Sequence, residues 1–180
     1  MNNKNFLQAI FALSAILIFG SVFNSFGKDN SFDSSDNISE ADFSFLVLPD
    51  DDIEYDIFDL VNQERRRRRL SDLEWNKDVA KIARNYSKRM ARENFFDHYD
   101  SNGDSIVERA KSVHLKNWSK IGENLFYCEG IKNYSGFAVK GWLNSSSHRQ
   151  NMLDREWKES GIGVAKSRDG RVYVTQIFIK

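Results

Sequence analysis

The side chains best able to do chemistry in this sequence are two histidines and a glutamate. In chain order they are His98, Glu123 and His148. Neutral imidazoles and carboxylates are ligands of Zn²⁺, and two histidines with one glutamate and an open position occur in catalytic zinc sites. The sequence has no HExxH pair that would set two ligands on one helix. Only the tertiary fold can therefore bring these three residues together.

A second kind of chemistry would use a serine nucleophile. Ser145 or Ser147 could lie beside His148, with Glu123 orienting the imidazole. A GxSxG turn, which would support this interpretation, is absent. Structural roles are the alternatives: His98 as a cation at a helix end, Glu123 as a surface carboxylate at a strand start, and His148 as a helix cap.

The periodicity of apolar residues predicts helices followed by closing strands. We expect helices over 54–67, 78–94 and 134–145, and a short helix capped by Ser105 with Glu108 in a capping box. Asn76 or Lys77 should cap the 78–94 helix, and Phe137 should point inward from the 134–145 helix. Strands are expected over 121–127, 160–165 and 171–179, the last two joined by a turn ending at a glycine. This order indicates an α+β fold rather than repeated βαβ units.

Seven short segments together carry a family resemblance. They occur in one order, at plausible spacing, within the region from Tyr55 to Lys180. The segments are 61–65 (VNQER), 73–76 (LEWN), 96–98 (FDH), 122–125 (GENL), 142–153 (WLNSSSHRQNML), 161–164 (GIGV) and 173–176 (YVTQ). This part of the chain resembles the bacterial branch of the CAP superfamily, which comprises the cysteine-rich secretory, antigen-five and pathogenesis-related proteins and is also called the SCP-like domain.

The resemblance implies a three-layer α-β-α sandwich with a central, mainly antiparallel sheet and a large cleft. In many members the cleft holds two histidines and two glutamates that can bind a divalent metal such as zinc. His98, Glu123 and His148 match three of these positions, and the fourth falls on Ser145. We therefore expect the four residues in a cleft, and His98, His148 and Glu123 as the candidate metal ligands. No cofactor is expected to be required.

Two functions are compatible with such a cleft. The first is an extracellular, non-enzymatic binding module for a small lipophilic, wall-derived or protein ligand. The alternative is a metal-dependent hydrolase that uses His98, Glu123 and His148. The absent fourth carboxylate and the lack of a recognisable base favour binding over catalysis.

The sequence pattern of the N-terminal residues predicts that the protein is exported. Lys4 precedes an apolar run over 6–20, which as a helix would span about 22 Å, less than a bilayer core of about 30 Å. Residues 1–27 are therefore predicted to be a signal peptide, with an uncleaved anchor as the alternative and the only expected membrane contact. Residues 28–52 are predicted to be an acidic, mostly disordered linker, and residues 53–180 the folded domain. The expected location is secreted, cell-surface or periplasmic.

Charge is distributed unevenly along the chain, although the formal net charge is zero. Ten acidic residues and no lysine or arginine lie between Asp29 and Asp56, whereas Phe58–Lys180 has 24 basic and 16 acidic residues, a net charge of +8. The five arginines at 65–69 are interpreted as a solvated helix end, with polyanion binding as the alternative. No nucleic acid partner is expected, because aromatic residues are not interleaved with the arginines. Cys128 is the only cysteine, which excludes an intramolecular disulfide.

Overall fold

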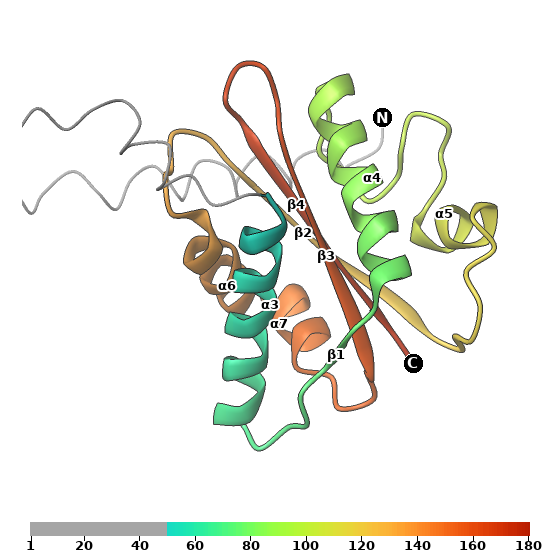
Figure 1. Cartoon of the computed structure of the whole chain (residues 1–180), viewed down its shortest axis with the longest axis vertical. Coiled ribbons are helices and arrows are strands. Elements are labelled where there is room, and N and C mark those ends of the chain that lie inside the picture. The colour runs from blue at the N-terminus through green and yellow to red at the C-terminus, as the bar shows by residue number, and fades with distance from the viewer. Residues whose placement is uncertain (1–49) are drawn as a thin grey trace, which may run out of the picture. The chain divides into compact units, whose positions relative to one another are not determined.

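The computed structural model describes residues 50–180, which form three layers (Figure 1). The helices are α3 (Asp50–Arg67), α4 (Lys77–Glu93), α5 (Ile106–Ser112), α6 (Tyr134–Asn144) and α7 (Ser146–Met152). The strands are β1 (Glu74–Trp75), β2 (Ile121–Cys128), β3 (Glu159–Lys166) and β4 (Val172–Ile179). Helices α4 and α5 lie on one side of the sheet, and α3, α6 and α7 lie on the other. The predicted α+β, three-layer sandwich is confirmed.

The sheet is mixed but mainly antiparallel, with the strand order β1-β3-β4-β2. Strand β4 pairs antiparallel with both β3 and β2, and β1 pairs parallel with β3. The β3–β4 turn has Gly170 at a φ of +88°, as its sequence predicted. Strand β2 forms one edge of the sheet, so segments from both helical layers can meet beside it.

Two glycines in β3 allow helix α4 to approach the sheet closely. A Cβ atom at Gly163 would lie 2.1 Å from the backbone nitrogen of Arg84, and one at Gly161 would lie 2.2 Å from that of Ala80. The hydroxyl of Ser87 donates to the Gly163 carbonyl at 2.8 Å. Gly161 and Gly163 of the GIGV segment are therefore required, because a side chain at either position would not fit between α4 and β3.

Capping residues begin α4 and α5 where the sequence predicted. The Asn76 side chain accepts bonds from the backbone nitrogens of Asp78 and Val79 at 2.9 and 3.0 Å. Ser105 and Glu108 form the complete capping box at the start of α5. Both helix starts are thus determined by local sequence.

Several local predictions were wrong or incomplete. Helix α3 begins at Asp50 rather than at Glu54, which suits acidic residues because a helix N-terminus carries partial positive charge. Strand β1 and helix α7 were not predicted, since both are too short to show a clear period. Phe137 is exposed, whereas Trp142 on the same helix is buried.

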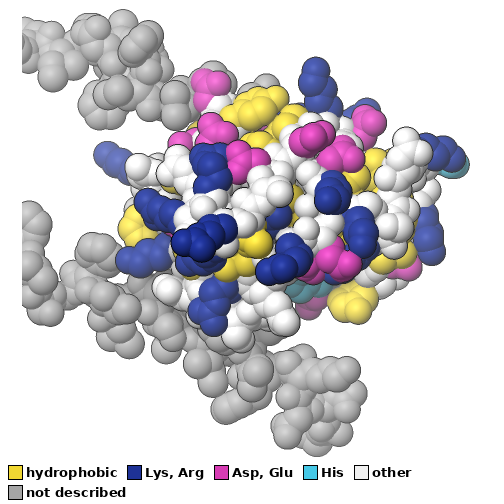
Figure 2. Space-filling model, turned by 90° about the horizontal axis from the view of Figure 1, so that it is seen from below, with side chains coloured by type: hydrophobic (Ala, Val, Ile, Leu, Met, Phe, Trp, Pro, Cys, Tyr) yellow, Lys and Arg dark blue, Asp and Glu magenta, His cyan; other side chains and the backbone are white. Residues whose placement is uncertain are grey.

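The arginine run at the end of α3 is not uniformly solvated. Arg66 to Arg69 are exposed, and lysine and arginine side chains gather on the face of the domain seen from below (Figure 2). Arg65, in contrast, is 0 % exposed. Its Nε donates to the Ser71 carbonyl at 2.9 Å, and its Nη1 donates to the carbonyls of Met152 and Asp154 at 2.9 and 3.0 Å. The solvated interpretation is therefore wrong for Arg65.

The predicted signal peptide over 1–27 and most of the predicted linker over 28–52 lie outside the described residues. Within 50–180, no helix is both long and apolar enough to cross a membrane. Cys128 is a buried free thiol, and burial raises its pKa to about 11.

Candidate functional site

Glu123, on the edge strand β2, is the centre of the candidate site. Only 2 % of its side chain is exposed. Its Oε1 lies 2.8 Å from Nδ1 of His98, and its Oε2 accepts a hydrogen bond from Nη2 of Arg109 at 2.5 Å. A buried carboxylate requires such partners, because it has lost the water that would stabilise its charge. Both oxygens of Glu123 are therefore engaged within the protein.

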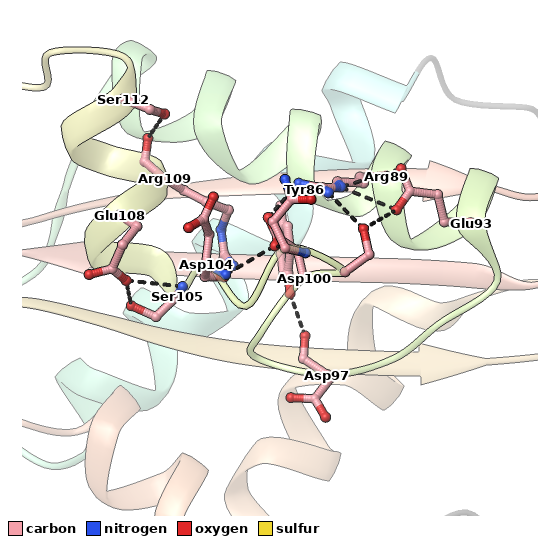
Figure 3. Close-up of polar contacts among 12 residues, drawn as sticks. Tyr86, Arg89, Glu93, Asp97, Asp100, Asp104, Ser105, Glu108, Arg109 and Ser112 are labelled. Atoms are coloured by element: carbon pink, nitrogen blue, oxygen red, sulfur yellow. Dashed lines mark hydrogen bonds and ion pairs between the residues drawn. The ribbon is translucent and has the colours of Figure 1, made fainter.

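Arg109 reaches this carboxylate from α5. Its Nη1 donates to the carbonyls of His98 and Asp104 at 3.1 and 2.9 Å, and its guanidinium lies 3.4 Å from the ring centroid of Tyr86. Figure 3 shows Arg109 beside Tyr86 of α4 and Asp104 of the intervening loop. One guanidinium thus joins the sheet, the ring of Tyr86 and the backbone of the loop that carries His98.

The loop that carries His98 is held at both ends. The Tyr86 hydroxyl donates to the Asp97 carbonyl at 2.6 Å, and burial raises the Tyr86 pKa well above its ordinary value, which keeps this donor protonated. Asp100 pairs with Arg89 of α4, and its Oδ1 accepts the backbone N–H of Asp104 at 3.0 Å (Figure 3). These contacts fix the position of His98 beside β2.

Two amides dock α7, and with it His148, on the other side of β2. Asn124 donates to the His148 carbonyl at 3.0 Å, and Asn151 donates to the Glu123 carbonyl at 3.1 Å and to Oδ1 of Asn124 at 3.0 Å. A Cβ at Gly122 would lie 2.9 Å from Oδ1 of Asn151. The GENL segment thus supplies one site residue, one bridging amide and the space that the bridge requires.

The structure brings the three predicted residues together at the edge of β2. The ring centroids of His98 and His148 lie 6.4 Å apart, and Glu123 bonds to His98. We call these three residues the His–Glu site. Ser145 is the N-cap of α7, and its Oγ lies 3.3 Å from Oγ of Ser147. Within the described part of the chain neither hydroxyl has a hydrogen bond to His148.

Burial, and then the neighbouring His98, lower the pKa of His148 below its ordinary value. The unfolded chain therefore binds more protons than the folded chain as the pH falls below about 6.5, so stability should fall in that range. We expect His148→Gln to reduce the loss of melting temperature between pH 7 and pH 5. Thermal melts of this variant and of His114→Gln, an exposed control, test this. An undiminished loss in His148→Gln would contradict the prediction.

The three residues as arranged do not form a three-ligand metal site. Within 50–180, no group of three or more His, Cys, Asp or Glu side chains is placed to hold one. The physical reason is that Oε2 of Glu123 accepts from the cationic Arg109, which would also repel a second cation. Ligation by His98, His148 and Glu123 would require Arg109 to withdraw.

Arg109 is the residue of this site that the sequence did not reveal. A buried glutamate needs a cationic partner, but the chain offers many arginines and nothing in their spacing selects this one. Its neighbour Glu108 in the capping box places it on α5, and the direction of its side chain follows only from how α5 packs beside β2.

Comparison with known sequences identifies relatives. Residues 58–178 match the cysteine-rich secretory protein family, CAP. The chain is 36 % identical over 129 residues to the Bacillus subtilis protein YlbC, named an uncharacterized membrane protein, covering 71 % of this chain and 34 % of YlbC. It is 32 % identical over 123 residues to YkwD of the same organism, covering 68 % and 45 %. The chain thus spans less than half the length of these two relatives.

Solved structures agree with the sequence match. An extracellular SCP-domain protein of Bacillus anthracis superposes with a TM-score of 0.62 at 30 % identity, covering 73 % of this chain and 41 % of that one. An outer surface protein of Borrelia burgdorferi gives a TM-score of 0.66 at 20 % identity, covering 74 % and 96 %, which shows the shared fold. By its sequence match, its sandwich architecture and these neighbours, this chain belongs to the cysteine-rich secretory protein (CAP) family.

Proposed function

We propose that this chain is an exported, non-enzymatic binding module whose His–Glu site recognises a ligand derived from the cell wall. The observation that carries the proposal is that both carboxylate oxygens of Glu123 already have partners. Oε2 accepts a hydrogen bond from Arg109 at 2.5 Å, and Oε1 lies 2.8 Å from Nδ1 of His98. Because both oxygens are engaged by protein groups, this carboxylate has no free oxygen with which to contact a substrate. The site is thus better suited to presenting fixed hydrogen-bonding groups than to moving protons.

The surface next to His98 supports a ligand with both polar and apolar faces. Phe96 and Tyr99 are 45 % and 60 % exposed, which is unusual for large aromatic side chains. In the chain they lie on either side of His98, whose side chain is itself partly exposed. Hydroxyl and amide groups of a wall glycan or peptide can bond to the imidazoles, while its apolar faces cover the aromatic rings.

Two further observations support the proposed location. Two structural neighbours are named as extracellular or outer surface proteins. Lys4 and the apolar run over 6–20 have the pattern of a signal peptide. Both support export to a compartment where wall material is accessible.

Co-sedimentation with purified cell walls tests the proposal. The full chain should sediment with walls in high salt, which suppresses adsorption driven by charge. His98→Ala/Tyr99→Ala should lower the affinity by about tenfold, which corresponds to a loss of about 1.4 kcal/mol of binding free energy. His114→Ala, which removes an exposed histidine outside the site, should bind like the wild type. Equal binding by all three proteins, or release of soluble wall fragments by the wild type, would contradict the proposal.

Zinc binding is a separate expectation for the same residues. Two imidazoles alone form an incomplete ligand set, so the wild type should bind Zn²⁺ weakly and should need both His98 and His148. Arg109→Gln should tighten binding, because it releases an oxygen of Glu123 and removes a competing charge. Calorimetric titration of the two proteins measures this, and an unchanged affinity in Arg109→Gln would show that Arg109 does not control access to the carboxylate.

A further inference from the structure

Arginines from three separate segments meet in one groove at the end of the domain where α3 finishes. The groove has a volume of about 760 Å³, and its lining includes Arg68 directly after α3, Arg149 in α7 and Arg155 in the loop before β3. We call it the arginine groove. The view of Figure 2 shows this end of the domain, where basic side chains are dense. Sequence alone does not show this convergence, because only Arg68 belongs to the arginine run.

Buried Arg65 fixes the two sides of the groove relative to each other. Its bonds to the carbonyls of Met152 and Asp154 attach the segment after α7 to the end of α3. The bond from Arg149 Nη1 to the Leu143 carbonyl, at 2.9 Å, holds a second cation in place. Arg149 is therefore held at a set position in the groove, which lowers the entropy lost when a ligand binds.

The groove keeps a net positive charge. Asp154 is the only acidic residue in its lining, and its carboxylate already accepts a bond from Lys120 Nζ at 2.6 Å. Lys120 accordingly lowers the pKa of Asp154. Arg149 and Arg155 form no ion pair with any other residue between 50 and 180. Two cations thus remain for a ligand from outside this part of the chain.

The lining chemistry suits phosphate groups. Guanidinium groups bind phosphate through paired N–H donors, and the hydroxyl of Ser146 and the amide of Gln150 add neutral donors. The residues that line this groove include no aromatic side chain, so it offers nothing on which nucleic acid bases could stack. We propose that the arginine groove binds a linear, phosphate-bearing polymer of the cell surface through its phosphates. This site goes beyond the His–Glu site, and its proposal rests on the proposed function only for the export of the chain.

Titration of the full chain with polyphosphate, followed by fluorescence anisotropy over a range of salt concentrations, tests this proposal. The groove variant is Arg149→Gln/Arg155→Gln. The control is Arg92→Gln/Arg168→Gln, which removes the same charge from exposed positions elsewhere. Each lost phosphate contact lowers the slope of log affinity against log salt by roughly 0.7 to 0.9. The groove variant should therefore lose about 1.5 from this slope and at least tenfold in affinity at low salt, and the control should lose much less.

Three results would overturn the proposal. Wild-type protein that fails to bind polyphosphate at low salt would show that the groove is no phosphate site. An equal loss in the groove variant and the control would show that only net charge matters. Tighter binding of single-stranded DNA with the same number of phosphates would indicate recognition of bases, and the partner would then be a nucleic acid.

Discussion

Replacing Gly163 with alanine should lower the free energy of unfolding by roughly 3 kcal/mol or more, a large part of the 5 to 15 kcal/mol typical of a domain. The new Cβ would lie 2.1 Å from the backbone nitrogen of Arg84 and 2.2 Å from the backbone carbon of Ala83. Backbone atoms cannot swing away as a side chain can. Helix α4 would have to move off β3, and the contacts it makes with the sheet would weaken along its length.

The matched control is Gly136→Ala in α6. No atom lies within 4 Å of a Cβ built at Gly136, and alanine is favoured over glycine in a helix by up to about 1 kcal/mol. This variant should be as stable as the wild type or slightly more stable. Urea unfolding followed by circular dichroism compares the two. A Gly163→Ala protein with the wild-type midpoint would show that α4 and β3 are less tightly apposed than described.

Replacing Arg65 with methionine should have the second large effect, a loss of roughly 3 kcal/mol. Methionine has a similar length but no donors, so the carbonyls of Ser71, Met152 and Asp154 would each lose a partner. An unsatisfied buried polar group costs about 1 to 3 kcal/mol. The segment after α7 should also lose its hydrogen bonds to α3, because within residues 50–180 Arg65 supplies those to Met152 and Asp154.

Arg66→Met is the control for Arg65→Met. Arg66 is exposed, and its ion pair with Asp72 at 2.5 Å is of a kind that contributes about 1 kcal/mol or less. Thermal unfolding of both variants should separate them clearly. Equal melting temperatures would mean that the buried position of Arg65 adds nothing to stability.

These arginines show where prediction from sequence ends. Asn76, Ser105 and Glu108 could be interpreted correctly because a cap acts within a few residues of its own helix. Arg65 stands in a run of five identical residues, and its burial depends on carbonyls that follow it by more than eighty positions. No local pattern distinguishes Arg65 from Arg66.

The candidate site, too, could be predicted from the sequence only in part. His98, Glu123 and His148 were selected through the family resemblance, and the structure places them at one edge of the sheet. The pairing of Glu123 with Arg109 was not predicted, because it depends on how α5 packs beside β2. The residue types of the site could thus be predicted, whereas its charge balance required the tertiary fold.

The strand order has a consequence for the timing of folding. The two central strands, β3 and β4, follow all the other described elements in the chain, and both outer strands and the long helix α4 need them for their contacts. Until Glu159–Ile179 is available, the earlier segments have no sheet to join, so native contacts must close over long stretches of chain. The domain should therefore remain unfolded while it is being made and fold only after its last strand is released. A chain that is still unfolded can pass through a translocation channel.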